Sequence, residues 1–156
     1  MMVGSGVFTE AEILGGLPAE LRPFVGIQSE PLHRSFTSII EAFWLAARRI
    51  NKVTRIRRPI FVYFGKAPFI LDLSLGELRY TPKSDELINA YVEETIFLDC
   101  EKMMRYPFPI QVACILEEFV HAIMSVEDEG LVTQVVGWLY EDIVIVDGRY
   151  TLRSAM

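Results

Sequence analysis

Two long segments carry apolar residues at steps of three and four, the spacing that places side chains on one face of an α-helix. The first is predicted to begin at Ser29-Glu30-Pro31 and to run to about Asn51, with an apolar stripe of Phe36, Ile39, Ile40, Phe43, Trp44, Ala47 and Ile50. The second begins at Tyr106-Pro107-Phe108-Pro109 and ends near Ser125, with Val112, Ile115, Leu116, Phe119, Val120 and Ile123 on its apolar side. Both apolar faces are expected to lie against the core.

Short apolar runs bounded by turn residues lie between the two helices, and this pattern predicts strands. They cover residues 59–64, 69–73, 77–80 and 94–99, of which the middle two are expected to form a hairpin. Strands interspersed with amphipathic helices indicate a mixed class rather than a helical bundle.

The two ends of the chain carry local signals of their own. Thr9-Glu10-Ala11-Glu12 has the form of a capping box, and it starts a short helix that Gly15-Gly16 ends. Another helix is predicted to start at Val126-Glu127-Asp128-Glu129, with apolar residues at Val132, Val135, Val136, Leu139 and Ile143. Residues 143–146 and 149–152 flank Asp147-Gly148, a strong two-residue hairpin turn. The pattern therefore predicts a single α+β domain over residues 1–156.

The polar side of the second long helix carries the candidate chemistry. It is formed by Gln111, Cys114, Glu117, Glu118, His121 and Ser125. Charged groups on a largely apolar helix are costly to bury unless they are paired or bind a metal. Glu117 and His121 are one helical turn apart, so both can reach one ion, and Glu118 can reach a water on that ion.

The composition and net charge of the chain argue against several classes of protein. Half of the 156 residues are apolar, so a sizeable core is expected, and the net charge of −6 makes a nucleic-acid partner unlikely. A run of about 18 apolar residues, which a membrane span needs, does not occur. The first residues lack the basic start of a secretory signal, and the two cysteines lie apart, so a cytoplasmic protein without a disulfide framework is expected.

One short span is strongly basic despite the acidic balance. It contains Arg48, Arg49, Lys52, Arg55, Arg57 and Arg58. A cationic helix end that leads into a solvated turn explains the pattern, because the helix dipole favours positive charge there. A binding patch for an acidic partner is the alternative.

The segment Glu117-Glu118-Phe119-Val120-His121 resembles the H-E-x-x-H signature of zinc peptidases at every defined position but the first. The order of a helix, several strands, the signature helix and a second helix also resembles the zincin metallopeptidases, most closely the small bacterial and phage type, over roughly residues 35–143. This resemblance implies a zincin-like fold with an N-terminal backing helix and a small twisted mixed sheet. It also implies that strand 94–99 forms the sheet edge along a cleft that binds an extended peptide.

The resemblance implies roles for individual residues. Glu118 stands at the position of the general base, His121 at that of the second zinc histidine, and Glu117 replaces the first. An acidic residue of the following helix completes the metal site, with Glu129 the first choice, Asp128 the next and Glu141 a rival. A nearby donor, for which Tyr140 is the candidate, would stabilise the oxyanion. One histidine with two carboxylates can bind zinc, but manganese or iron fits this degenerate set better.

Three functions stay open. The first is a weak or specialised metal-dependent peptidase. The second is a pseudoenzyme without metal that holds a peptide or protein partner in the old cleft, with Glu117 then paired to a neighbour such as Arg105. The third is a di-iron carboxylate protein, because E-x-x-H occurs twice. Its ligands would be Glu30, His33, Glu118 and His121 with Glu41, Glu93 and Glu94. The strands predicted between residues 59 and 99 argue against a di-iron protein, because such a site needs four long helices.

Cys114, on the polar side of the second long helix, is interpreted as a small apolar residue that fills space.

Overall fold

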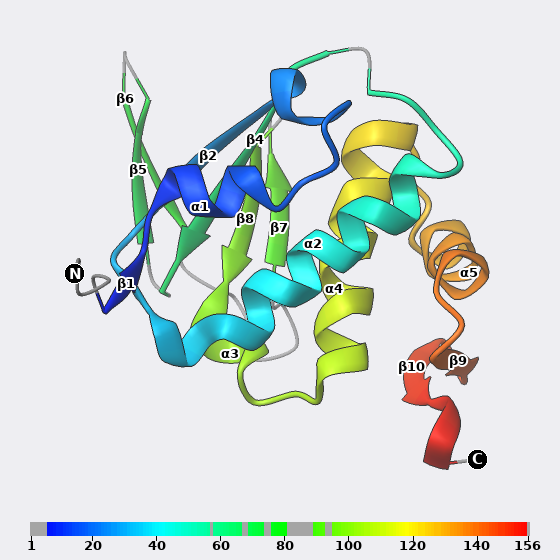
Figure 1. The fold of residues 1–156 in the computed structure, drawn as a ribbon. Helices are drawn as coiled ribbons and strands as arrows, with labels where there is room; N and C mark the ends of the chain where they lie inside the picture. The colour runs from blue at the N-terminus through cyan, green and yellow to red at the C-terminus, as the bar shows by residue number, and fades with distance from the viewer. Residues whose placement is uncertain are drawn as a thin grey trace.

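A four-stranded mixed sheet organises the fold in the computed structural model (Figure 1). The structure describes residues 6–56, 58–66, 69–73, 76–80, 89–92 and 95–155. The sheet strands, in spatial order, are β2 (Val25–Ser29), β4 (Ile60–Gly65), β8 (Thr95–Asp99) and β7 (Asn89–Val92). The first three run parallel, and β7 pairs antiparallel with β8. Helices and strands both make up the fold, with the described strands between residues 60 and 99 consecutive in the chain and helices after them between residues 100 and 139, so the α+β class predicted from the sequence is confirmed.

Two helices pack side by side against this sheet and carry most of the core (Figure 1). They are α2 (Thr37–Asn51) and α4 (Phe108–Met124). Both helices end within a few residues of their predicted C-terminal ends. The chain continues into α5 (Glu129–Leu139) and the hairpin of β9 (Ile143–Val146) and β10 (Arg149–Leu152). No single helix in the described part of the chain is long and apolar enough to cross a membrane, and α4 and α5 reach that length and composition only together, across a bend of 112°.

The remaining elements are short. They are β1 (Val7–Phe8), α1 (Glu10–Gly15), η1 (Arg22–Phe24), β3 (Leu32–His33), η2 (Arg34–Phe36), β5 (Phe69–Leu73), β6 (Gly76–Tyr80), α3 (Cys100–Met103) and η3 (Arg153–Ala155). Strands β5 and β6 form the expected hairpin. Strands β9 and β10 form the second one, and Asp147 and Gly148 between them have φ angles of 51° and 74°, as a two-residue primed turn requires.

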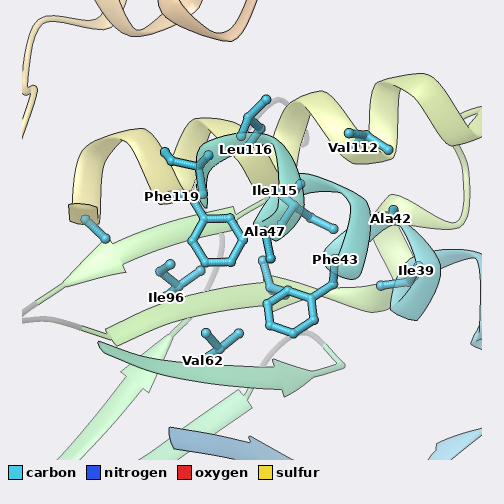
Figure 2. Close-up of a cluster of buried hydrophobic side chains, with 14 of the residues drawn as sticks. Ile39, Ala42, Phe43, Ala47, Val62, Ile96, Val112, Ile115, Leu116 and Phe119 are labelled. Carbon is cyan, nitrogen blue, oxygen red and sulfur yellow. The ribbon is translucent and has the colours of Figure 1, made fainter. Parts of the chain in front are cut away.

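Phe43 lies at the centre of the core and joins three elements. Its ring meets Phe64 of β4 edge to face at 5.0 Å and stacks on Phe119 of α4 at 5.7 Å. Figure 2 shows this ring beside Phe119, with Val62 and Ile96 on the neighbouring strands. Because the apolar side of α4 is held in this way, its polar side faces away from the core.

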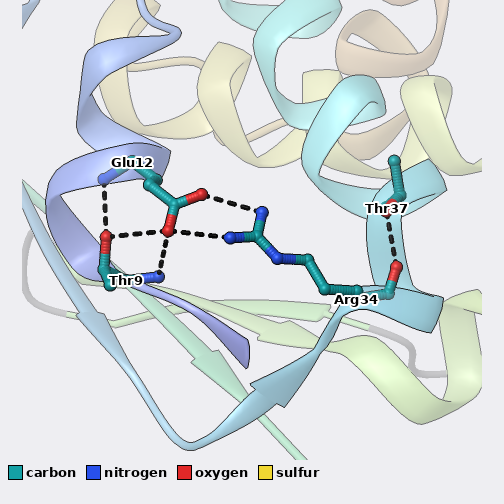
Figure 3. Close-up of polar contacts among 4 residues, drawn as sticks. All are labelled: Thr9, Glu12, Arg34 and Thr37. Carbon is teal, nitrogen blue, oxygen red and sulfur yellow. Dashed lines mark hydrogen bonds and ion pairs between the residues drawn. The ribbon is translucent and has the colours of Figure 1, made fainter. Parts of the chain in front are cut away.

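The predicted capping box is confirmed at the start of α1. Thr9 and Glu12 exchange hydrogen bonds between side chain and backbone, and Arg34 pairs with Glu12 at 2.8 Å (Figure 3). The hydrogen bond from Arg34 is the largest cause of the lowered pKa of Glu12. Thr37, the first residue of α2, donates to the carbonyl of Arg34. This network therefore ties α1 to the start of α2.

The first long helix begins later than predicted. Glu30 precedes a proline, which disfavours the helical conformation at that position. Leu32 and His33 instead pair with β1, and regular helix starts at Thr37. Strand β2 was not predicted, because Gly26 and Gln28 interrupt its apolar pattern and its partner β4 lies far along the chain.

The expectation that strand 94–99 forms the sheet edge is wrong. Strand β8 is paired on both sides, with β4 and with β7. Its consecutive residues Ile96, Phe97 and Leu98 are all buried, a run that is typical of an interior strand. In the described part of the chain β7 is the outer strand on this side, and Glu94 lies outside the described residues.

Candidate metal centre

A cleft of about 1230 Å³ opens beside the polar side of α4. Its walls include α4, the turn after it, the first half of α5 and strand β10, together with Arg58 and Asn89. The polar part of its lining includes Glu117, Glu118, His121, Glu129, Thr133 and Tyr150. The helix side that the sequence singled out therefore lines this cleft.

Three predicted ligands meet in this cleft. One ligand atom from each of Glu117, His121 and Glu129 lies within 4.8 Å of the other two. Ser125 ends α4 in a left-handed conformation, with φ 55°. The chain thereby reverses, so that the first residue of α5 returns to the last turns of α4. Glu129 was the first of three choices for the third ligand, and it is the one that the fold brings to the other two.

Hydrogen bonds fix which atom each ligand offers. The Nδ1 atom of His121 lies 2.7 Å from the carbonyl oxygen of Val126. A carbonyl only accepts, so Nδ1 carries the proton and Nε2 faces the other ligands. Tyr150 donates its hydroxyl proton to Oε2 of Glu117 at 2.6 Å, which leaves Oε1. Such outer contacts are typical of metal sites, because they orient the ligands.

The donor set fits a divalent cation. His121 Nε2 lies 3.3 Å from Glu129 Oε1. Two ligand atoms at about 2.0–2.1 Å from one ion, at the tetrahedral angle, are about 3.3 Å apart. One imidazole nitrogen and two carboxylate oxygens are all ligand types that zinc, manganese and iron accept. The same 3.3 Å also suits a direct ion pair between a protonated His121 and Glu129.

Negative charge accumulates in the cleft. Glu118 is only 7% exposed, and burial, followed by the charges of Glu117 and Glu129, raises its pKa to about 8. Burial also raises the pKa of Glu117, against the hydrogen bond from Tyr150, and the charge of Glu129 adds to the rise. Glu118 lines the cleft without belonging to the ligand group. A bound cation would relieve this repulsion among the carboxylates.

The two rival ligands have other partners. Asp128 caps α5, and its Oδ1 accepts from the backbone N–H of Leu131 at 2.8 Å. Glu141 is exposed and pairs with Arg49 at 2.8 Å. The tyrosine proposed for the oxyanion is also elsewhere. Tyr140 is 1% exposed and donates to Asp142, so the prediction for Tyr140 is wrong because the end of α5 turns it into the core.

Tyr150 is a cleft residue that the sequence analysis missed and that contacts a candidate ligand. It lies on β10, outside the residues that resemble zincins, and nothing in its neighbourhood marks it as functional. Its burial, followed by the charge of Glu117, raises the pKa of its hydroxyl group, so it stays a proton donor. Glu117 thus contacts Tyr150 rather than forming the predicted ion pair with Arg105.

The di-iron arrangement does not form among the described residues. Glu30 lies before β3 and His33 is its last residue, so neither lies on a long helix, and His33 contacts Ser35. Glu93 and Glu94 lie outside the described residues. The sheet between α2 and α4 in sequence also replaces the helices that a four-helix di-iron site requires.

Two residues of the basic span, Arg49 and Arg58, contact other parts of the fold. Arg58 donates to the carbonyl of Ala122 and to the hydroxyl of Ser125, so it caps the end of α4. Arg49 belongs to the ion pair with Glu141, and Arg57 lies outside the described residues. Burial raises the pKa of Cys114 to about 12, so this thiol remains protonated although it lines the cleft.

The cleft therefore joins a possible three-ligand cation site to a buried carboxyl group that can exchange a proton. That combination is what hydrolysis of a carbonyl compound needs. No protein-family model matches this chain, and neither a curated protein nor a solved structure is found to match it.

Proposed function

We propose that this protein is a zincin-like, metal-dependent peptidase of low catalytic power. It binds one divalent cation through Glu117, His121 and Glu129, and it uses Glu118 as the general base. The observation that carries the proposal is the meeting of Glu129 with the two α4 ligands in one cleft. Glu129 lies on α5 and the other two ligands lie on α4, so helix periodicity alone does not explain why the three are close together.

The arrangement of the fold supports the same proposal. Helix α2 lies against α4, where a backing helix would lie, and α5 follows α4 after a short turn. The mixed sheet contributes β7, an antiparallel outer strand that contacts α4. Asn89 of β7 lines the cleft, so an extended peptide would lie between this strand and the ligands.

The cation site and Glu118 have separate roles in the proposed hydrolysis. A bound cation supplies a polarised water and a Lewis acid for the carbonyl oxygen. Glu118 takes a proton from the water and passes it to the leaving amine. Its pKa of about 8 means that it holds a proton near neutral pH. A cation bound by the neighbouring Glu117 and Glu129 would lower that pKa towards the working range.

The ligand set explains the low catalytic power. Two carboxylates cancel more of the charge of the cation than the two histidines of the usual signature. The cation then polarises water less strongly. Manganese or iron suits oxygen ligands better than zinc does, so all three are candidate cofactors.

The test is hydrolysis of a broad peptide library by protein loaded with zinc, manganese or iron. We expect slow cleavage that stops after chelation and returns when the metal is restored, with products identified by mass spectrometry. If protein loaded with each of the three metals cleaves no peptide, the proposed peptidase activity is wrong.

The second candidate is a non-catalytic module that holds a peptide or protein partner in the same cleft. The observation in its favour is that the ligands have partners without a cation. His121 lies 3.3 Å from Glu129, and Tyr150 lies 2.6 Å from Glu117. This candidate predicts that peptides bind to the cleft of chelator-treated protein without being cleaved.

A further inference from the structure

Tyr150 reaches the candidate ligands from the end of the chain. It lies on β10, whereas Glu117 lies on α4, yet its hydroxyl group donates to Oε2 of Glu117 at 2.6 Å. It lines the cleft and is half-buried. A short hydrogen bond to a carboxylate is one of the stronger polar contacts in proteins. The contact therefore fixes the orientation of the Glu117 side chain.

The packing of the terminal hairpin explains why Tyr150 is there. Tyr150 is the direct cross-strand partner of Ile145, so both side chains point to the same face of the hairpin. Ile145 packs over Gly137 of α5, where an added Cβ would come within 2.6 Å of its Cδ1 atom. The missing side chain at Gly137 lets the hairpin approach α5 closely. Tyr150 is thereby carried towards Glu117.

We propose that Tyr150 is a positioning residue that lets Glu117 replace the first histidine of the signature. The hydrogen bond occupies Oε2, so Glu117 offers Oε1 alone and binds through one atom, as an imidazole does. It also draws negative charge away from the carboxylate, which makes the ligand more like a neutral one. This inference rests on the metal binding in the proposed function.

The test compares Tyr150→Phe with Tyr140→Phe. Each substitution removes one tyrosine hydroxyl group that donates to a carboxylate, to Glu117 in one case and to Asp142 in the other. Zinc affinity is measured by competition with a chromophoric chelator, and circular dichroism checks that both variants are folded. We expect Tyr150→Phe to bind zinc about 10–100-fold more weakly, the usual effect of losing such a partner. Tyr140→Phe should bind as the wild type does.

A second readout separates positioning from a general loss of stability. The visible absorption spectrum of the cobalt-substituted protein reports ligand geometry, and it should change in Tyr150→Phe alone. Equal zinc affinity in Tyr150→Phe and the wild type would overturn the inference and leave the proposed function standing. Equal weakening in both variants would also overturn it. Wild-type protein that binds no metal would overturn the inference and the proposed metal site together.

Discussion

Replacing Phe43 by alanine is expected to lower the free energy of unfolding by about 3–5 kcal/mol. Phe43 has no solvent-exposed surface and contacts Phe64 and Phe119 on two other elements. The substitution removes both ring contacts and leaves a cavity that the close-packed helices cannot fill. Urea denaturation followed by circular dichroism measures the effect.

Phe61→Ala is the matched control for this prediction. Phe61 lies on β4, the strand that also carries Phe64, but it is 51% exposed. Its replacement should cost no more than about 1 kcal/mol, in the range of substitutions outside the core. Equal losses in the two variants would show that Phe43 does not hold α2, α4 and β4 together.

Replacing Glu118 by glutamine is expected to flatten the pH dependence of stability in chelator-treated protein. The pKa of Glu118 is raised in the folded state from its ordinary value of 4.5 to about 8. The folded state therefore binds this proton more tightly than the unfolded state does. The resulting stability is fully present below pH 4.5 and is lost as the pH rises through 8. The loss is at most about 1.4 kcal/mol for each pH unit.

Urea denaturation of the two proteins at a series of pH values between 5 and 8 measures this slope. Glutamine has no titrating proton, so Glu118→Gln should show a shallower decline than the wild type. Glu127→Gln is the control, because Glu127 lines the same cleft but is exposed. It should keep the wild-type slope. A wild type without the decline, or the same decline in Glu118→Gln, contradicts the interpretation of Glu118 as a buried carboxyl group.

Local sequence signals predicted the helices and hairpins well. The apolar stripe around Phe43, the capping box at Thr9 and the turn at Asp147 each act over a few residues, and each is confirmed. Strand order was not predictable in the same way. The parallel pairing of β2 with β4 and the interior place of β8 depend on contacts between distant segments, which local patterns do not encode.

The candidate site, too, was predicted where local patterns determine it and missed where contacts between distant segments do. The shared side of Glu117, Glu118 and His121 follows from helix periodicity. The choice of Glu129 came from the resemblance to zincins, and the structure brings it to the other two. The contact of Tyr150 could not be foreseen, because it depends on how the terminal hairpin packs on α5.

The central claim is that Glu117, His121 and Glu129 bind a metal, and the metal content of the purified protein tests it most directly. Elemental mass spectrometry after incubation with zinc, manganese or iron should find one equivalent in the wild type. Glu117→Ala, His121→Ala and Glu129→Ala should lose it, whereas Glu141→Ala should keep it, since Glu141 pairs with Arg49 outside the site. A wild type that binds none of the three ions, or ligand variants that retain one, would contradict the account.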